Sequence, residues 1–578
     1  MENQKNAQYT GARILIEALV EQGVDTIFGY PGGTVLNIYD ELYKHKNRIR
    51  HILVSHEQHA AHAADGYARA TGRTGVCLAT SGPGATNLVT GIATAYMDSI
   101  PVVAITGNVA TELLGRDSFQ EVDIAGITMP VVKHNWIVKD VRELAEVVRE
   151  AFIVARSGRP GPVLIDIPKD VTAASADISS FLFNASSTIS ERAARLTMRN
   201  ERETFTADDL CGAVKMIEAA KRPVIYAGGG VIIANAADEL ARFAARIDAP
   251  VALSLMGQGA LSRENPLWMG MIGMHGTVAS NRAVQNADLL ITIGARFSDR
   301  VTSRAGQFAP NAGILHFDID PAEINKNIRS EASVSGDISK ILRGILEKLP
   351  KQEHGDWLAL VRKWKESVPA AHTIQEEADS PLHPRFIVEE AARAAGAGAF
   401  VVTDVGQHQM WTAQFYPFDF PRQLITSGGL GTMGFGLGAA LGVKAGAPDK
   451  TTVLFTGDGS FRMNCAELGT LGAEGLAVLV IVLNNGVLGM VRQWQSLFYE
   501  NRYSETVLDR PPDFVTLAQA YGARGFRARG ASEFRAALKD AFAALACGKS
   551  CVIDAVISRD ERVLPMVPSG KPIDEQII

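Results

Sequence analysis

Two polar residues that follow strongly apolar segments carry the clearest chemical signal in this sequence. Asp458 lies within Gly457-Asp458-Gly459-Ser460, directly after the apolar run 453–456, and Asn485 follows the apolar run 478–483. One helical pattern, from about residue 464 to residue 473, separates the two motifs. This is the pattern of a β-α-β unit. It places Asp458 and Asn485 at the carboxyl ends of two neighbouring parallel strands, where open α/β sheets bind ligands.

A carboxylate and an amide oxygen at this spacing suit a hard cation such as Mg²⁺, which takes few protein ligands and adds phosphate oxygens. Gly457 and Gly459 let backbone N–H groups approach a diphosphate closely. Either motif alone is equally well explained by an ordinary turn at the end of a strand. Together, at this spacing, they predict a metal-bound diphosphate.

A competing hypothesis comes from Gly429, Gly431 and Gly434, which match the GxGxxG pattern of nicotinamide dehydrogenases. That pattern requires an acidic residue at the end of the next strand, about 20 residues further on. Asp458, which lies 24 residues beyond Gly434, could be that acid. The dehydrogenase hypothesis, however, leaves Asn485 without a role.

The bulk composition excludes several classes of protein. The 578 residues exceed what one core can organise, and the net charge of −6 without a basic block argues against a nucleic-acid partner. The longest apolar runs are too short to span a membrane. The polar amino terminus lacks the features of a signal or transit peptide, so we expect a cytoplasmic protein. The five cysteines form no CxxC pair, and we expect reduced, buried thiols.

The elements that must position these residues alternate between strands and helices. A helix capped by Thr10 and ended by Gly23 opens the chain. Alternation of this kind predicts an α/β protein with three doubly wound parallel-sheet domains. We place them at residues 1–185, 204–350 and 382–578, joined by polar linkers at 184–203 and 351–381. The expected strands are 26–28, 75–79, 102–106 and 163–167, then 224–227, 289–293 and 314–318, then 400–403, 452–456, 477–483 and 551–555.

Further segments give the chain a specific resemblance. GDGS followed by NN is similar to the defining motif of thiamin-diphosphate enzymes. SHEQ (55–58), DSFQEVD (117–123), GRPGPVLIDIPKD (158–170), IGMHGT (272–277), ARFSDRVT (295–302) and GMVRQWQSLFYENRYSET (489–506) resemble the catalytic subunit of the acetohydroxyacid synthase (acetolactate synthase) family. The combination of SFQE, a lysine after VLIDIP, MHGT and VRQWQ is the most specific part. The resemblance covers nearly the whole chain.

The resemblance implies an assembly and three cofactors. The domains would bind, in order, the pyrimidine of thiamin diphosphate, FAD, and the diphosphate with Mg²⁺. Each active site would combine the first domain of one subunit with the third domain of another, so a homodimer or a dimer of dimers is expected. A regulatory small subunit is a further expected partner. Asp458, Asn485 and the backbone carbonyl of Val487 would hold the metal.

The resemblance also assigns roles to single residues. Glu57, which follows a strand-like segment and opens a helical pattern, would exchange protons with the pyrimidine. The catalytic group would further contain Gly33, Phe119, Gln120 and Lys169, and Trp494 would shape the pocket for the second substrate. Met433, which alone would be assigned to core packing, would hold thiamin diphosphate in its bent form. Other cofactor-binding residues would be Gly431, Gly457, Gly459, Ser460 and Met490 for thiamin diphosphate, and Arg159, Gly228, Gly229, Met274, His275, Arg296, Arg300, Asp318 and Asp337 for FAD.

The implied activity is decarboxylation of pyruvate and transfer of its two-carbon unit to a second 2-ketoacid, pyruvate or 2-ketobutyrate. This reaction belongs to the biosynthesis of valine, leucine and isoleucine. Another thiamin-dependent carboligase or decarboxylase, including a flavin-free fermentative acetolactate synthase, and a non-catalytic cofactor-binding paralogue remain alternatives. His56, His59 and His62 suggest zinc, but Ala60 breaks the HExxH pattern. Asn37, Gly438, Gln258 and Leu261-Ser262 depart from the family pattern.

Overall fold

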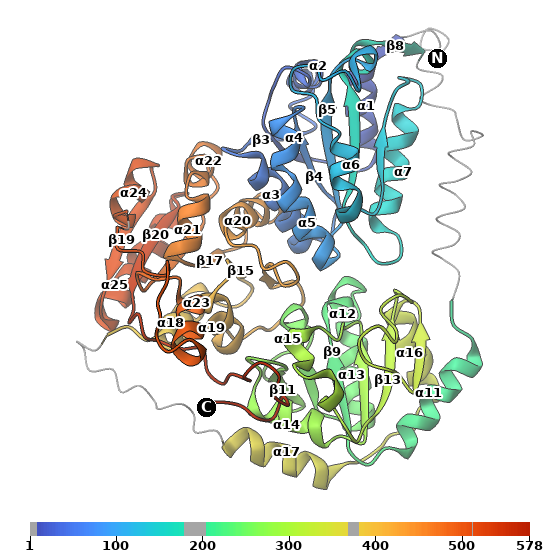
Figure 1. Ribbon diagram of the computed structural model, residues 1–578, viewed down its shortest axis with the longest axis vertical. Helices are drawn as coiled ribbons and strands as arrows, with labels where there is room; N and C mark the ends of the chain where they lie inside the picture. Colours follow the sequence, from blue (N-terminus) through green and yellow to red (C-terminus); the bar gives the residue numbers. More distant parts are fainter. Residues whose placement is uncertain (1–7, 178–203, 368–380, 511) are drawn as a thin grey trace.

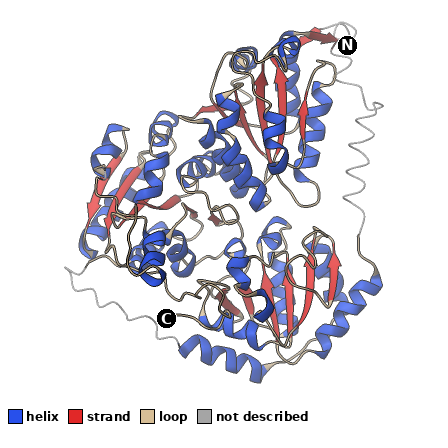
Figure 2. Cartoon of the chain, viewed as in Figure 1, coloured by secondary structure: helices blue, strands red, loops and turns tan. Residues whose placement is uncertain are grey.

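Three parallel six-stranded sheets organise the chain in a computed structural model that describes residues 8–177, 204–367, 381–510 and 512–578. Figure 1 shows them as three lobes, blue, green and orange, and Figure 2 shows helices on both faces of each sheet. The predicted α/β class with three doubly wound sheets is confirmed. The domain boundaries stay a prediction, and the expected linker at 184–203 lies outside the described residues.

The first and third sheets share one topology. In spatial order the first contains β3 (Arg50–Leu53), β2 (Thr26–Gly29), β4 (Gly75–Ala79), β5 (Val102–Asn108), β7 (Val163–Pro168) and β6 (Asn135–Ile137). The third contains β16 (Leu424–Ile425), β15 (Phe400–Thr403), β17 (Thr452–Gly457), β18 (Leu479–Asn484), β20 (Cys551–Val556) and β19 (Arg524–Ala528). Numbered along the chain within each sheet, both orders are 2-1-3-4-6-5.

The middle sheet has a different order. It contains β11 (Trp268–Met271), β10 (Val251–Leu253), β9 (Pro223–Ala227), β12 (Leu289–Ile293), β13 (Gly313–Asp318) and β14 (Ala332–Ser335), which is 3-2-1-4-5-6 along the chain. This is the strand order of dinucleotide-binding folds, whose ligands lie where the order reverses, outside the ends of strands 1 and 4. The middle lobe therefore offers such a site beside the ends of β9 and β12.

The helices fill the connections between strands. The first lobe contains α1 (Gly11–Glu21), α2 (Leu36–Lys44), α3 (Glu57–Thr71), α4 (Pro83–Asn87), α5 (Val89–Asp98), α6 (Ile124–Thr128), α7 (Leu144–Arg156) and α8 (Lys169–Ala173). The middle lobe contains α11 (Ala207–Ala219), α12 (Gly229–Ile233), α13 (Ala237–Ile247), α14 (Val278–Asn286), α15 (Asp299–Thr302), α16 (Ile338–Lys348) and α17 (Gly355–Ser367). The third contains α18 (Pro384–Ala395), α19 (Gln407–Phe415), α20 (Gly436–Gly446), α21 (Asp458–Asn464), α22 (Glu467–Glu474), α23 (Gly489–Phe498), α24 (Phe514–Ala520) and α25 (Ala531–Ala546). A short antiparallel pair, β1 (Gln8–Thr10) and β8 (Ser175–Asp177), closes the first lobe.

Several expectations about local structure need correction. Residues 355–367 form α17 instead of a linker, because Trp357, Leu358 and Val361 bury one apolar face of it. The helix expected at 464–473 is divided into α21 and α22. The thiols of Cys211 and Cys547 are exposed, so only part of the expectation of buried cysteines holds, although all five cysteines are free.

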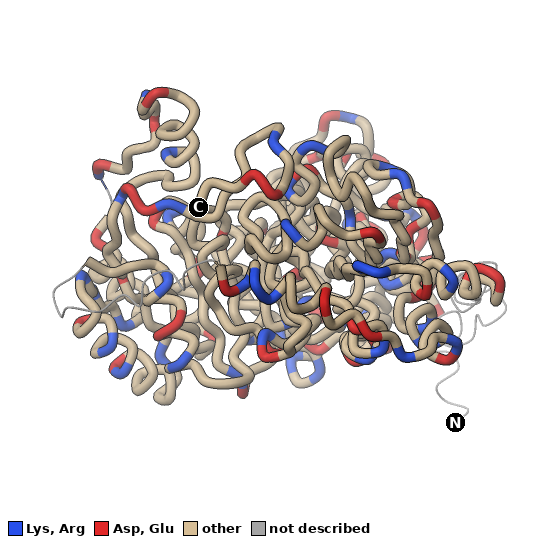
Figure 3. Tube along the Cα trace, turned by 90° about the horizontal axis from the view of Figure 1, so that it is seen from below, with Lys and Arg blue, Asp and Glu red and all other residues tan. Residues whose placement is uncertain are grey.

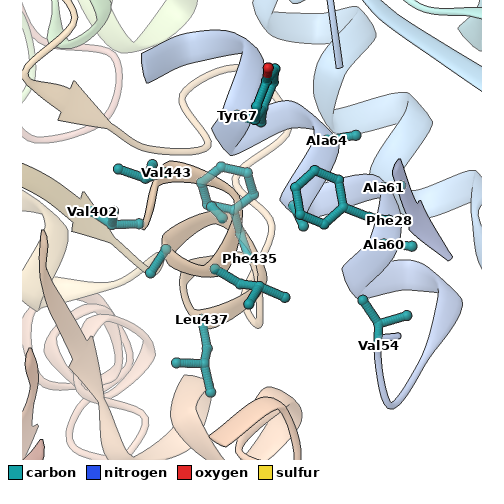
Figure 4. Packing of buried hydrophobic residues seen from close by; sticks show 14 of the residues in the cluster. Phe28, Val54, Ala60, Ala61, Ala64, Tyr67, Val402, Phe435, Leu437 and Val443 are labelled. Atoms are coloured by element: carbon teal, nitrogen blue, oxygen red, sulfur yellow. The ribbon is translucent and has the colours of Figure 1, made fainter. Parts of the chain in front are cut away.

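The first and third lobes share one hydrophobic core, centred on α3 and α20 (Figure 4). Small residues bring the two helix backbones close together. A Cβ atom on Gly66 would overlap the carbonyl of Ala439, and one on Gly442 would overlap the carbonyl of Ala63. Gly438, a departure from the family pattern, lies on the same face, where a Cβ atom would lie 3.0 Å from the Cβ of His62.

The segment after β20 returns to the middle lobe, as the red trace beside α14 shows in Figure 1. The backbone of Val567 donates to Met274 at 2.8 Å, and Asn281 donates to the carbonyl of the fully buried Ile573 at 2.8 Å. Charged residues of both signs are interspersed along the trace in Figure 3. Among the described helices, none combines the length and the apolar composition that a bilayer span requires.

Candidate active site

Asp458 and Asn485 lie at the carboxyl ends of adjacent parallel strands. β17 and β18 pair directly, with Gly457 opposite Leu483, so the predicted juxtaposition is confirmed. Asp458 is the first residue of α21, and Asn485 immediately follows β18. The short connections fix both side chains at one edge of the third sheet.

The Asp458 carboxylate is suited to a cation. Its side chain is buried, and its Oδ2 atom has no hydrogen-bond partner among the described residues. Burial raises the pKa of Asp458 to about 7, although backbone N–H groups at Asp458, Gly459 and Gly486 act in the opposite direction. A divalent cation would compensate the buried charge and occupy the unpaired oxygen. The residues present therefore fit Mg²⁺.

Neighbouring contacts hold Asn485 and the Val487 loop in place. Asn485 donates from Nδ2 to Gln407 Oε1 at 3.2 Å, and its Oδ1 accepts from Val487 N at 3.2 Å. The loop is further held by hydrogen bonds of 2.8 Å from Leu488 N to Thr506 O and from Leu508 N to Gly486 O. Because an amide oxygen has two lone pairs, Asn485 Oδ1 can still bind a cation.

Two residues that the sequence reasoning missed complete this edge of the sheet. Gln407 donates to Gln493 Oε1 at 3.0 Å, in addition to accepting from Asn485. His408 is buried, and burial lowers its pKa to about 3, so the ring is neutral. Its Nε2 atom has no partner among the described residues, and a Cβ atom on Gly457 would lie 2.9 Å from its Nδ1. The signal was available, since Gly406-Gln407-His408 follows the apolar strand β15 as the GDGS motif follows β17.

The remaining residues expected at thiamin diphosphate take different positions around this edge. A Cβ atom on Gly459 would lie 3.7 Å from Met433 Cε, so Met433 reaches the GDGS turn. Ser460 is buried and donates to Val405 O at 3.2 Å. Gly431 and Met490 instead line the large cavity described below. Gly429 N, the first N–H of the GxGxxG match, donates to Asp98 Oδ1 at 2.7 Å, which withdraws it from a phosphate.

Glu57 belongs to a second cluster, in the first lobe. It is the first residue of α3, and His56 caps that helix. Asn87 donates to Glu57 Oε2 at 2.9 Å, and a Cβ atom on Gly84 would lie 3.3 Å from Oε1. Gln120 lies against the same loop, because a Cβ atom on Gly82 would come 2.9 Å from the Gln120 Cβ. The structure therefore brings Glu57 and Gln120 to one loop, residues 82–87.

The other expected catalytic residues are exposed. Phe119 is 87% exposed, and Lys169 opens α8 with its side chain exposed. Gly33 is exposed too, and a Cβ atom added there would meet nothing within 4 Å. Asn37 donates to Thr172 Oγ1 at 2.9 Å and to Lys169 O at 3.4 Å, which ties α2 to the helix that carries Lys169. Within the described residues, no hydrogen bond or ion pair links Glu57 to Asp458 or Asn485.

A cavity of about 1180 Å³ lies between the lobes and reaches the reversal point of the middle sheet. Eight of the nine residues expected to bind FAD line it, namely Arg159, Gly229, Met274, His275, Arg296, Arg300, Asp318 and Asp337. Gly228 does not; it packs against Ala295, whose Cβ a side chain would approach to 2.6 Å. The size and the strand order fit a dinucleotide.

Charged and neutral polar groups surround this cavity. Burial lowers the pKa of His275 to about 4, and its Nδ1 lies 3.2 Å from Pro565 O, so the neutral ring donates from that atom. Arg159 pairs with Glu323 at 2.8 Å and with Asp320 at 3.3 Å. Asp337 caps α16 by accepting from Lys340 N at 2.9 Å. Arg300 is largely exposed, lies 3.5 Å from the Asp299 carboxylate and lines the cavity.

Trp494 lies on α23, with its ring centroid 5.1 Å from that of Phe498. Trp494 and Met490 line the large cavity and also a smaller one of about 730 Å³, which Tyr499 and Arg502 border. Trp494 is therefore positioned to shape a pocket. The three histidines do not form a metal site: His56 caps α3, His59 contacts Glu467, and His62 packs edge-on against Phe435.

Comparison with known proteins identifies each lobe. Residues 9–127 match the N-terminal TPP binding domain of thiamine pyrophosphate (thiamin diphosphate) enzymes, residues 210–345 their central domain, and residues 404–555 their C-terminal TPP binding domain. The chain is 46% identical to the acetolactate synthase large subunit of Corynebacterium glutamicum, over 97% of this chain and 89% of that protein. It is 43% identical to the acetolactate synthase isozyme 3 large subunit of Escherichia coli, over 98% of each chain. A probable acetolactate synthase large subunit of Methanocaldococcus jannaschii is 45% identical, over 97% of this chain and 94% of that protein.

These matches remove the dehydrogenase hypothesis. Domains that bind thiamin diphosphate lie at both ends of the chain, and Glu57 and Asp458 each fall within one of them. The chain belongs to the acetolactate synthase large-subunit family of thiamin-diphosphate-dependent enzymes.

Proposed function

We propose that this chain decarboxylates pyruvate and joins the two-carbon unit to a second 2-ketoacid, giving 2-acetolactate or 2-aceto-2-hydroxybutyrate for branched-chain amino-acid biosynthesis. The main observation behind this proposal is that the chain contains two separate clusters of polar residues. In one, the Asp458 carboxylate has an oxygen without a partner among the described residues, and in the other, Asn87 holds Glu57. Membership of the acetolactate synthase family supports this assignment.

In this proposal Asp458, Asn485 and the carbonyl of Val487 hold Mg²⁺, which anchors the diphosphate. Glu57 moves a proton at the pyrimidine ring, and Met433 supports the ring system from the side of Gly459. Bound thiamin diphosphate supplies the electron sink for loss of carbon dioxide. Gly33, Phe119, Gln120 and Lys169 face the reacting 2-ketoacids, and Trp494 shapes the site of the second one.

FAD occupies the cavity of about 1180 Å³ in this proposal, held by the residues that line it and serving structure, since the net reaction is not a redox reaction. A second copy of the chain completes the active site in this proposal, as the resemblance to the acetohydroxyacid synthase family implies. A small subunit is a further proposed partner, in keeping with the name "large subunit" of the relatives.

The test is incubation of the purified protein with thiamin diphosphate, Mg²⁺ and FAD, with pyruvate alone and with a pyruvate and 2-ketobutyrate mixture, followed by product identification. Acetolactate supports the proposal, and acetaldehyde as the sole product would indicate a decarboxylase instead. Absence of any product, with cofactors bound and with any required small subunit supplied, would favour a non-catalytic paralogue. Colourless but fully active protein would contradict the role of FAD.

A further inference from the structure

Glu467, at the start of α22 in the third lobe, is a buried carboxylate that contacts the first lobe of the same chain. Its side chain is completely shielded from solvent. Its Oε1 accepts from Ser55 N at 2.9 Å and lies 2.9 Å from His59 Nδ1. Its Oε2 accepts from Thr470 Oγ1 at 2.7 Å and from Ser55 N at 3.2 Å. Every oxygen of this carboxylate is therefore satisfied, as burial requires.

These contacts lie on both sides of Glu57. Ser55 is two residues before Glu57, in the segment that leads from β3 into α3, and His59 is two residues after it, in the first turn of the helix. Ser55 Oγ adds a bond of 3.3 Å to Ala466 O. One side chain of the third lobe therefore holds a backbone N–H before, and a side chain after, the residue proposed to move the proton.

The position of Glu467 also suits the helix it contacts. The N-terminal turn of α3 carries partial positive charge from its unpaired N–H groups, which stabilises a nearby carboxylate. Loss of the carboxylate would remove the acceptor of Ser55 N and free the His59 ring. Both changes permit rotation of the first turn of α3, and small displacements of a reacting group slow catalysis strongly.

We propose that Glu467 is a positioning residue that sets the placement of Glu57 in the active site. This inference rests on the proposed function, in which Glu57 moves the proton. Because α22 follows α21, the helix that Asp458 begins, one segment holds the metal of one active site and positions Glu57 for the other active site of the dimer.

The test compares Glu467→Ala, Glu467→Gln and the control Glu474→Gln. Glu474 lies on the same helix and also contacts the first lobe, through a salt bridge of 2.8 Å to Arg50, but at the surface. The direct readout is the rate at which C2–H of enzyme-bound thiamin diphosphate exchanges with deuterium, measured by NMR after acid quenching. It is recorded beside kcat, KM for pyruvate, cofactor affinity and oligomeric state.

We expect Glu467→Ala to slow exchange and to lower kcat by about tenfold or more, with KM and cofactor affinity nearly unchanged. Glu467→Gln should recover most of the loss, since its carbonyl still accepts from Ser55 N. Glu474→Gln should match the wild type. A Glu467→Ala exchange rate within about twofold of the wild type, in folded and cofactor-loaded protein, would overturn the inference.

Two further variants keep the result decisive. If Glu467→Ala does not fold, His59→Leu removes one of the two flanking contacts and should slow exchange by about threefold or more; an unchanged rate then overturns the inference. Glu57→Gln measured in parallel separates the two proposals. Wild-type exchange in Glu57→Gln defeats the role of Glu57 itself, whereas slow exchange there with normal exchange in Glu467→Ala defeats only the positioning role.

Discussion

Asn87 donates a hydrogen bond of 2.9 Å to Glu57 Oε2, while Glu57 Oε1 makes no hydrogen bond within the described residues. The first contact fixes the plane of the carboxylate, and the second oxygen remains available for a ligand. A side chain prepared in this way can exchange a proton with a bound ring without first breaking a contact of its own.

Glu57→Gln should lower kcat by about 100-fold or more, because general acid–base groups contribute at least that much and the amide cannot take up a proton. The volume and the bond from Asn87 are conserved, so the protein should remain folded. Steady-state kinetics together with sedimentation analysis would show this. Normal turnover in the variant would remove Glu57 from the mechanism.

Gln407→Leu should raise the Mg²⁺ concentration needed for half-maximal activity by about tenfold, since loss of groups that orient metal ligands typically has effects of that size. The reason is that Gln407 Oε1 fixes the amide of Asn485. Gln414→Leu is a matched control on the same helix, because Gln414 bonds His275 O and Leu564 O instead. An equal Mg²⁺ requirement in both variants would contradict the assignment.

Trp494→Leu should change mainly the choice between pyruvate and 2-ketobutyrate as the second substrate. Its indole borders both cavities, so a smaller side chain changes the shape of the pocket. Such a change typically alters the discrimination between two substrates that differ by one methylene by about 1–3 kcal/mol. Competition between the two ketoacids, with both products quantified, measures this ratio. A wild-type ratio at reduced rate would assign Trp494 to packing alone.

Gly230→Ala should reduce flavin content severalfold. A Cβ atom there would lie 2.7 Å from the backbone of Gly294, so the ends of β9 and β12 would have to separate at the point where the dinucleotide is expected. Gly212→Ala is the control, since nothing lies within 4 Å of its Cβ position. The ratio of flavin to protein absorbance reports the result, and equal ratios in both variants would argue against a flavin at this point.

Asp166 gives a prediction about pH. Burial raises its pKa to about 6, above the ordinary value of 3.8, although bonds from Thr106 and Asn108 act in the opposite direction. The folded chain therefore holds the proton more tightly than the unfolded chain. This proton stabilises the folded state fully when the pH is below 3.8, the ordinary pKa. The stabilisation disappears as the pH rises toward 6, and its full size is about 1.4 kcal/mol for each unit by which the pKa is raised.

Asp166→Asn removes this titration. We expect the denaturant concentration at the unfolding midpoint of the wild type to decrease, relative to that of the variant, as the pH rises from about 4 to about 6. Above that range the difference should stay constant. Chemical denaturation at several pH values, followed by tryptophan fluorescence, tests this. Parallel pH profiles for the two proteins would contradict a raised pKa.

Apolar strands and the polar residues that follow them could be predicted from the sequence, because burial on both faces of a parallel sheet leaves a continuous apolar run. β17 and β18 are such strands, and Asp458 and Asn485 were found because each comes directly after one of them in the sequence. β16, with two residues, has too little pattern to be found. Gln407 and His408 were missed because the sequence Gly406-Gln407-His408 after β15 was not recognised as the counterpart of the GDGS motif after β17.

Direct contacts between the first and third lobes could not be predicted. Ser55 and Glu467 are 412 residues apart, and no local pattern in either segment specifies that they meet. The same holds for the close packing of α3 on α20, which depends on which glycines face each other. α17 was missed because its charged residues concealed a single apolar face.

The return of residues 563–578 to the middle lobe has a consequence for the order of folding. Gln576 donates to Gly276 O at 2.8 Å, across 300 residues of sequence, and Pro565 O is the partner of His275 at the cavity wall. During synthesis the middle lobe therefore emerges long before the segment whose Pro565 carbonyl holds His275 at the cavity wall. Capture of flavin should consequently be a late event, one that reports assembly of the entire chain and not of the middle lobe alone.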